Sequence, residues 1–334
     1  MNKKKIALIG GAGFIGHNLA ISLKKRGHTP VVIDSLAVNN MLSFTDKEIK
    51  NRKLYWSILN QRMDLLHDID IEINVEDARN YNVMSMLLGE VKPDVIVQLA
   101  AVSHANKSNK DPHTTFDHTL RTLENTLDIA KSYGSHIIYF SSSMAYGHFD
   151  GKSVDENTQC NPLGIYGTLK YSGELIVKAY HRVFDIPYTI IRPSALYGER
   201  CVSRRVSQIF IENAVQDLDI TINGDGGDLL DFTYIDDLTK GIILAIEKKE
   251  SQNETFNLTY GEARSIGEMA EILKDHFPKI NINYIPKDNL TPDRGTLKIE
   301  KARKLLGYEP EFAIDKGYPK YIKWYKEFWN ELKK

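Results

Sequence analysis

The sequence is poor in cysteine, in net charge and in long hydrophobic runs, and each shortage excludes a class of protein. Two cysteines, Cys160 and Cys201, are too few for a disulfide framework or a four-ligand zinc site, so we expect a reducing, cytoplasmic setting and no metal centre. The 43 Lys and Arg residues balance 44 Asp and Glu, which argues against a nucleic-acid partner. No apolar stretch is long enough to cross a bilayer, so we expect no membrane partner.

Proline and glycine are also scarce, at 11 and 22 of 334 residues, while 42% of the chain is hydrophobic. This composition excludes collagen-like and low-complexity proteins and predicts a folded chain. The length exceeds what one small core needs, so we expect one large domain or two unequal ones that share a cleft.

Strand-like and helix-like segments alternate along the first 192 residues. An apolar strand at 5–9 is followed by a helical pattern at 14–26 and a second strand at 31–33. Further apolar runs follow helical segments, at 95–99, 137–140 and 189–191. Such alternation predicts an α/β fold with a doubly wound parallel sheet of at least five strands.

The pattern of strand-like and helix-like segments changes after Arg192: the segments become short, and polar turns such as Asn223–Gly227 appear between them. We predict a second, smaller α/β lobe made of residues 193–229 and 259–334, and a larger domain made of residues 1–192 and 230–258. Within the larger domain, the charge-rich connection 39–70, with a helix predicted at 45–60, is interpreted as a solvated excursion without a chemical role.

A glycine cluster follows the first strand. Gly10, Gly13 and Gly16 allow a sharp turn, a close approach to a pyrophosphate and tight packing of the next helix, whose amide dipoles face the anion. Such a motif alone fits a plain turn equally well. Here Asp34 stands at the end of the second strand, eighteen residues after Gly16. A carboxylate at that position accepts hydrogen bonds from both ribose hydroxyls of NAD and repels the 2′-phosphate of NADP. The pattern predicts a Rossmann-type site that prefers NAD to NADP.

Tyr166 and Lys170 are four residues apart, so a helix places them on one face. Among 17 tyrosines, Tyr166 alone has a lysine at this spacing, although chance surface pairs of this kind are common. A nearby ammonium lowers the pKa of a phenol, which suits removal of a proton from an alcohol. The run Ser141–Ser143 follows the strand 137–140, at the sheet edge where ligands of such folds bind.

Together these motifs resemble those of the extended short-chain dehydrogenases/reductases, which epimerise, dehydrate or oxidise nucleotide-linked sugars. The resemblance spans nearly the whole chain and implies Ser142, Tyr166 and Lys170 as catalytic residues. It also implies that NAD is bound by Gly10, Gly13, Phe14, Ile15, Gly16, Asp34, Asp77, Ala78, Leu99, Ala100, Ala101, Ser141, Tyr166 and Lys170.

The same resemblance implies a nucleotide-diphosphate sugar as substrate. The residues expected to contact it are Ser103, Ser143, Met144, Ser194, Arg204, Arg205 and Arg294. Two departures from the family pattern narrow the reaction. Ser143–Met144 replaces the Asp-Glu pair of dehydratases, which disfavours 4,6-dehydration, and Leu230 replaces an arginine that clamps the diphosphate. Arg204 and Arg205 are candidates for the missing charge, although a solvated turn explains them equally well.

Three functions remain open on the sequence. The first is a C4 epimerase that keeps NAD, and the second is a C4 dehydrogenase that gives a 4-keto sugar, similar to the GDP-manno-heptose C4 dehydrogenases of capsule synthesis. The third, a non-catalytic NAD-binding or scaffold protein, would have lost Tyr166 or Lys170, and both are present. The resemblance further implies a homodimer formed through helices at 113–132 and 166–184.

Overall fold

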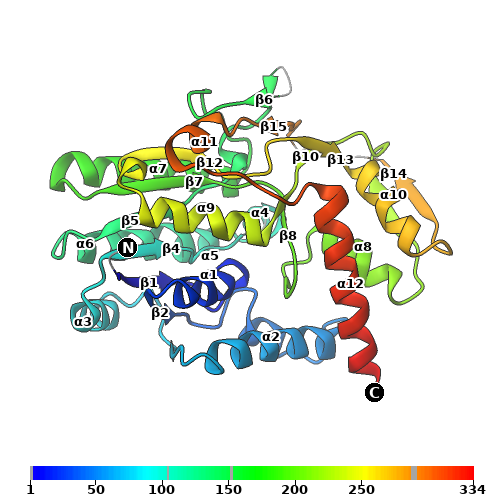
Figure 1. Cartoon of the computed structure of the whole chain (residues 1–334), viewed down its shortest axis with the longest axis horizontal. Coiled ribbons are helices and arrows are strands. Elements are labelled where there is room, and N and C mark those ends of the chain that lie inside the picture. Colours follow the sequence, from blue (N-terminus) through cyan, green and yellow to red (C-terminus); the bar gives the residue numbers. More distant parts are fainter. Residues whose placement is uncertain (1–2, 104, 151–152, 287–291) are drawn as a thin grey trace.

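A parallel sheet of seven strands forms the centre of the larger part of the molecule (Figure 1). The computed structural model describes residues 3–103, 105–150, 153–286 and 292–334. In spatial order the strands are β12 (Glu254–Asn257), β7 (Tyr188–Arg192), β5 (His136–Phe140), β4 (Val95–Gln98), β1 (Lys5–Ile9), β2 (Thr29–Ile33) and β3 (Ile73–Asn74). The strand order reverses between β1 and β4, which is where doubly wound sheets bind their ligands. The predicted α/β fold is confirmed.

Helices cover both faces of this sheet because its strands are apolar on both sides. In β1, Ile6 and Leu8 enter the core with α1 (Phe14–Lys25) and α9 (Ile235–Glu247), together with α11 (Glu300–Leu306). Ala7 and Ile9 point the other way, into the core with α3 (Tyr81–Val91), α6 (Thr122–Ala130) and α7 (Ile165–Phe184). Alternate residues of a strand face opposite sides, so a continuous apolar run requires two helical layers.

A smaller lobe lies at the right of Figure 1. It contains α8 (Val206–Ala214), α10 (Ile266–His276) and α12 (Ile314–Lys333), with β9 (Ile220–Asn223) paired to β14 (Ile282–Ile285) and β10 (Leu229–Asp231) paired to β13 (Ala263–Ser265). Two further pairs are β8 (Leu196–Tyr197) with β11 (Thr233–Tyr234), and β6 (Ser153–Val154) with β15 (Thr296–Leu297). The helices of the lobe, with β9 and β11, share a second apolar core, whereas Val154 of β6 and Leu297 of β15 pack in a separate small cluster with Tyr146 and Phe149.

The connection between β2 and β3 is not the solvated excursion that its charge suggests. Its helix α2 (Arg52–His67) begins seven residues later than predicted and buries Tyr55, Ile58 and Leu59 in the core of the smaller lobe. The Tyr55 hydroxyl donates to Glu212 of α8 at 2.8 Å. The apolar residues of α2 have helical spacing, but α12, which contacts it, is about 270 residues further along the chain, so the sequence gives no local sign of that partner.

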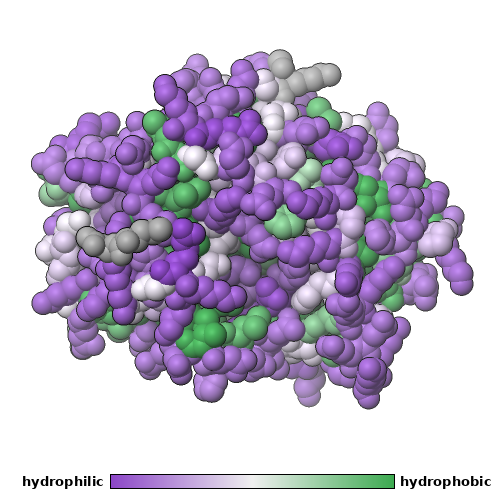
Figure 2. Space-filling view, in the orientation of Figure 1, coloured by the Kyte–Doolittle hydropathy of each residue, from purple (hydrophilic) through white to green (hydrophobic). Residues whose placement is uncertain are grey.

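The surface seen in Figure 2 is mostly hydrophilic, with hydrophobic side chains in small separate areas. Such scattered exposure is ordinary for a folded protein. Among the helices that the structure describes, none combines the length and the apolar character that a bilayer crossing requires. The division of the chain at residues 192, 230 and 258 stays a prediction.

Candidate active site

The turn from β1 into α1 packs so closely on its surroundings that Gly10, Gly11 and Gly16 leave no room for a Cβ. Gly10 has φ +82°, and a Cβ there would lie 2.8 Å from the backbone nitrogen of Ala100, just after β4. A Cβ at Gly16 would lie 2.4 Å from the Gly11 carbonyl oxygen. Gly13 is less crowded, with 3.2 Å to its nearest neighbour, and it lines a cavity. A side chain at position 13 would therefore enter the space that a bound dinucleotide needs.

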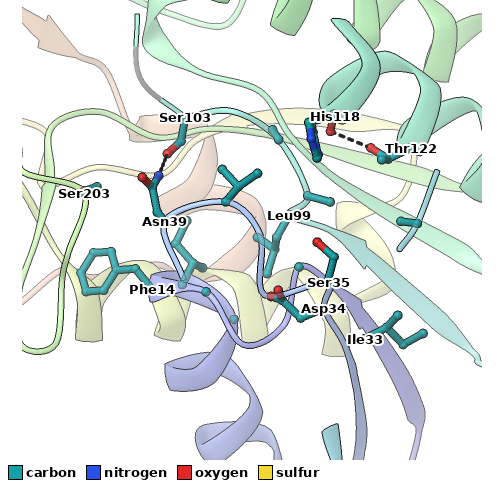
Figure 3. A pocket seen from close by; sticks show the side chains of 18 of the residues that line it. Phe14, Ile33, Asp34, Ser35, Asn39, Leu99, Ser103, His118, Thr122 and Ser203 are labelled. Atoms are coloured by element: carbon teal, nitrogen blue, oxygen red, sulfur yellow. Dashed lines mark hydrogen bonds between the residues drawn. The ribbon is translucent and has the colours of Figure 1, made fainter. Parts of the chain in front are cut away.

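The cavity beside this loop, called here the dinucleotide cavity, brings together most of the residues predicted to bind NAD (Figure 3). Those residues are Gly10, Gly13, Phe14, Ile15, Gly16, Asp34, Asp77, Ala78, Leu99, Ala100 and Ala101. Asp34 lies next to the glycine loop and accepts hydrogen bonds from Ala12 N–H (3.0 Å) and Leu36 N–H (2.7 Å). Burial raises the pKa of the Asp34 carboxyl, and these two bonds oppose that rise.

Sequence reasoning missed several residues that line the dinucleotide cavity. They are Ile33, Ser35, Val38, Asn39, Arg62, Glu76, His118, Thr122, Leu196, Val202 and Ser203. His118 belongs to η2 (Asp117–Arg121), a π-helical turn, and its carbonyl accepts from the Thr122 hydroxyl at 2.9 Å. Arg62 comes from α2, to which the sequence analysis assigned no chemistry. Ser103 and Arg205, which were expected on the substrate side, also line this cavity.

A second cavity, called here the substrate cavity, adjoins the first and contains the three predicted catalytic residues, Ser142, Tyr166 and Lys170. Ser141, also predicted to contact NAD, lies here too. The two cavities share six lining residues, Ile15, Leu99, Ala101, Ser103, Leu196 and Arg205. A dinucleotide in one and a second ligand in the other would therefore meet at these shared residues.

Helix α7 positions Tyr166 and Lys170 because it packs tightly on β5. A Cβ at Gly173 would lie 2.1 Å from the Tyr139 hydroxyl, so only glycine permits this approach. Interaction with the Ser142 side chain lowers the pKa of the Tyr166 phenol. The Ser142 hydroxyl also accepts from Met144 N–H at 3.2 Å and caps the short turn η3 (Ser143–Ala145).

The expectation that Lys170 makes the Tyr166 phenol acidic is wrong for this arrangement. Burial raises the pKa of Tyr166, and the opposing influences are the charge of Arg205 and the interaction with Ser142. Lys170 instead donates to the Phe140 carbonyl oxygen at 2.7 Å, and burial lowers its own pKa to about 7. Burial disfavours the charged ammonium form, so near neutral pH Lys170 is protonated in only part of the molecules.

This lowered pKa predicts how Lys170 affects stability as the pH changes. The folded chain binds a proton at Lys170 only below about pH 7, whereas the unfolded chain binds it up to about pH 10.5. Between those values the unfolded state holds more protons, so rising pH favours folding. We expect the free energy of unfolding of the parent, relative to that of Lys170→Met, to increase across this range in urea titrations. A difference that is flat with pH would contradict the shift.

A buried ion pair joins β7 to α7, the helix that carries Tyr166 and Lys170. Arg192 on β7 contacts Glu174 on α7 at 2.6 Å, and both side chains are almost fully buried. The Ser141 hydroxyl donates to the same carboxylate at 2.5 Å. The Ser141 side chain is therefore engaged in holding α7 against β5 and β7, although the residue lines the cavity.

Most residues predicted to contact the substrate line the substrate cavity: Ser103, Ser143, Met144, Ser194, Arg205 and Arg294. Arg204 does not line either cavity. Its backbone is left-handed (φ +51°) and its guanidinium lies 3.8 Å from Glu212, so this arrangement lends no support to the prediction for Arg204. Leu230 does line the cavity, as expected of a position that normally carries an arginine. The sequence analysis missed Asn106 and Asn109 of α4 (Ala105–Lys110), as well as Asn223 and Asp228.

The charges of the substrate cavity suit an anion. Burial and the charge of Arg205 lower the pKa of Arg294 to about 10, and Asp228 opposes both. Arg205 also donates to the Ser103 carbonyl oxygen at 3.2 Å. Two guanidinium groups that repel one another at one cavity are stabilised by an anionic ligand between them.

The family model described as "NAD dependent epimerase/dehydratase family" matches residues 6–259. The chain belongs to this family. The match confirms the resemblance to extended short-chain dehydrogenases/reductases, and with it that the protein is an enzyme whose cofactor is NAD. An uncharacterized UDP-glucose epimerase of Bacillus subtilis is 30% identical, with 94% of this chain and 95% of that protein covered.

Two further relatives are similar over nearly their whole length. The UDP-glucuronate 4-epimerase of Thermodesulfobacterium geofontis is 26% identical, with 95% of each chain covered. The crystal structure of UDP-glucuronic acid 4-epimerase from Bacillus cereus, in complex with UDP-glucuronic acid and NAD, superposes with a TM-score of 0.85. It is 28% identical and covers 97% of this chain and 99% of its own.

The glycine loop leaves room for NAD in the dinucleotide cavity, and Gly13 lines that room. A larger residue at position 13 tests whether the cofactor binds there. Gly13→Val would fill the part of the cavity next to Gly10 and is expected to weaken NAD binding by about 10-fold or more. The backbone at Gly13 has φ −71°, which valine can adopt, so the unfolding temperature should change little. Titration calorimetry and thermal unfolding measure the two effects. Unchanged affinity would show that the cofactor does not approach this position.

Proposed function

We propose that the protein catalyses 4-epimerisation of a nucleotide-diphosphate sugar, with Tyr166 as acid and base. The observation that carries the proposal is that Tyr166 and Ser142 together line the substrate cavity, which adjoins the dinucleotide cavity. A base that deprotonates a sugar hydroxyl must stand where the sugar and the nicotinamide meet.

The proposed roles of the chain's residues follow from this placement. Tyr166 would act as its phenolate, which the positive charge of oxidised NAD would favour against the effect of burial. Helped by the Ser142 hydroxyl, the phenolate takes the proton of the C4 hydroxyl, becomes the neutral phenol and later returns that proton to the C4 oxygen. NAD, when bound, would supply the redox chemistry that the protein lacks, namely reversible hydride transfer at C4. Lys170 holds the nicotinamide ribose. The sugar turns between the two transfers, so the hydride returns to its opposite face and the mass is unchanged.

The proposed substrate carries its diphosphate between Arg205 and Arg294. Support comes from their placement in one cavity and from the UDP-sugar activities of the relatives. Leu230 cannot contribute a charge, so the diphosphate must be held with a different set of contacts than an arginine at that position would provide.

A second candidate is oxidation at C4 with release of the 4-keto sugar, on a GDP-heptose or another unusual sugar. Leu230 in the substrate cavity favours it, because an altered phosphate site is compatible with a different substrate. Dehydration at C4 and C6 is disfavoured, since Ser143 and Met144 line the cavity where dehydratases place two carboxyl groups.

One experiment separates these candidates. The purified protein is incubated with UDP-linked hexoses and hexuronates and with GDP-linked sugars, while product mass and reduced nicotinamide are followed. Altered stereochemistry at unchanged mass supports epimerisation. Accumulated NADH with a product lighter by two hydrogens supports the dehydrogenase. Absence of turnover on every sugar of the panel would contradict both candidates.

We also propose that the protein is a homodimer formed through the outer faces of α5 (Pro112–Phe116), η2, α6 and α7. Lys170, Gly173 and Glu174 of α7 face the sheet, whereas Leu175 is half exposed. Phe116 and Phe184 are exposed in the same region of the chain. Leu175→Lys is expected to shift the molecular mass in light scattering from dimer to monomer. A parent protein that is already monomeric would refute the proposal.

A further inference from the structure

Arg62 is a fully buried arginine at the edge of the dinucleotide cavity. It lies on α2, has no exposed surface, and is among the residues that line that cavity. Its Nε and Nη2 both donate to the Arg200 carbonyl oxygen, at 2.9 and 2.5 Å. Its Nη1 is buried and has no hydrogen-bond partner among the residues that the structure describes.

A guanidinium nitrogen without an acceptor is costly in a buried position, because the group has lost its hydration without replacement. The polar groups that interact with Arg62 electrostatically, which include His17, Asp34, Cys201 and Tyr321, form no hydrogen bond with this nitrogen. His17 Nδ1 is 2.9 Å from the Gly13 carbonyl oxygen, and its Nε2 is 3.1 Å from Arg200 Nε. The Asp34 carboxylate attracts Arg62 electrostatically, but its hydrogen bonds are with Ala12 and Leu36.

These contacts indicate that the missing acceptor belongs to a ligand. We propose that Arg62 is a cofactor-binding residue whose Nη1 donates to an oxygen of the adenosine diphosphate half of NAD, either a ribose hydroxyl or a phosphate oxygen. That half is expected there because Gly13 and Asp34, which the pyrophosphate and the ribose require, line the same cavity. Helix α2 thus couples cofactor binding to the core that it shares with α8 and α12.

The first test compares ADP binding by two arginine variants of α2. Arg62→Met keeps the length of the side chain but removes the donors, and it is expected to weaken ADP binding by about 10- to 100-fold, as for a hydrogen bond from a buried charged group. Arg52→Met is the control, since Arg52 likewise donates to a carbonyl oxygen, that of Phe44, but does not line the cavity. It should bind ADP within about two-fold of the parent. Equal affinity of the parent and Arg62→Met in calorimetry would overturn the proposal.

Deoxy analogues of ADP then distinguish the two acceptors. If Nη1 contacts a ribose hydroxyl, removing that hydroxyl weakens binding to the parent much more than to Arg62→Met, because the two changes delete the same bond. If Nη1 contacts a phosphate oxygen, the loss of binding free energy caused by removing the hydroxyl and the loss caused by the substitution add together. A purely structural role of Arg62 would lower the unfolding temperature in a way that Arg62→Lys does not rescue, and would leave the affinity of the folded fraction unchanged.

A crystal structure of the parent protein with ADP-ribose decides the question even if Arg62→Met does not fold. The proposal expects Nη1 within about 3 Å of a ribose or phosphate oxygen. It is overturned if no oxygen of the ligand lies within hydrogen-bond distance of that nitrogen.

Discussion

Tyr166→Phe is expected to lower kcat by about 10²- to 10⁴-fold while leaving NAD affinity nearly unchanged. Phenylalanine keeps the ring in the substrate cavity but cannot accept the proton of the sugar hydroxyl. The Ser142 hydroxyl, which interacts with the phenol, is not a comparable base on its own. Steady-state turnover on the nucleotide sugar chosen by the substrate panel, together with NAD titration, measures both effects.

Tyr180→Phe is the matched control for this prediction. Tyr180 lies on the same helix, and its hydroxyl interacts with Glu124 at 3.4 Å on the side away from the cavities. Its loss should change kcat by less than about two-fold. Ser142→Ala should fall between the two variants, since it removes the hydroxyl that interacts with the phenol and not the base. A Tyr166→Phe enzyme with parental turnover would refute the catalytic role of Tyr166.

Glu174→Ala is expected to lower the free energy of unfolding by about 3–5 kcal/mol. The substitution leaves the Arg192 guanidinium buried without its carboxylate, and it also removes the acceptor of the Ser141 hydroxyl. Burial lowers the pKa of Arg192, but contact with Glu174 raises it above its usual value. The guanidinium therefore stays charged, and the free-energy cost of burying that charge is not relieved by loss of its proton. Urea unfolding at neutral pH measures the loss.

A surface pair provides the comparison. Lys320 and Asp236 are 2.8 Å apart but substantially exposed, so Lys320→Met should cost less than about 1 kcal/mol. The double variant Glu174→Leu/Arg192→Leu should be more stable than Glu174→Ala, because no unpaired charge remains. If Glu174→Ala cost no more than Lys320→Met, the buried pair would not anchor α7 on the sheet.

Local signals in the sequence were sufficient to predict the parallel sheet and the cofactor loop. Gly10 and Gly16 make contacts that a Cβ would block, and Asp34 follows β2 directly, so a short stretch of chain contains the whole pattern. Tyr166 and Lys170 were found for the same reason, since one helical turn separates them. The lining of the two cavities agrees with most of these assignments, although the role of each residue stays a prediction.

The features that sequence reasoning missed depend on contacts between distant segments. The partners of α2 lie on α8 and α12, so nothing near Arg62 in the sequence indicates that it reaches the dinucleotide cavity. Arg204 and Arg205 are adjacent, yet a left-handed backbone at Arg204 directs it to Glu212. The pKa of Tyr166 was predicted with the wrong sign because the spacing to Lys170 does not reveal how deeply both groups are buried.

The central claim is that a hydride leaves sugar C4 for bound NAD and returns to the same carbon. Its most direct test uses the nucleotide sugar selected by the panel, labelled with deuterium at C4, and follows the label in the product by mass spectrometry. The proposed epimerisation predicts an inverted product that keeps its deuterium at C4 in ordinary water, with a turnover slowed by the heavier isotope. An inverted product that has exchanged its deuterium for solvent hydrogen would contradict it.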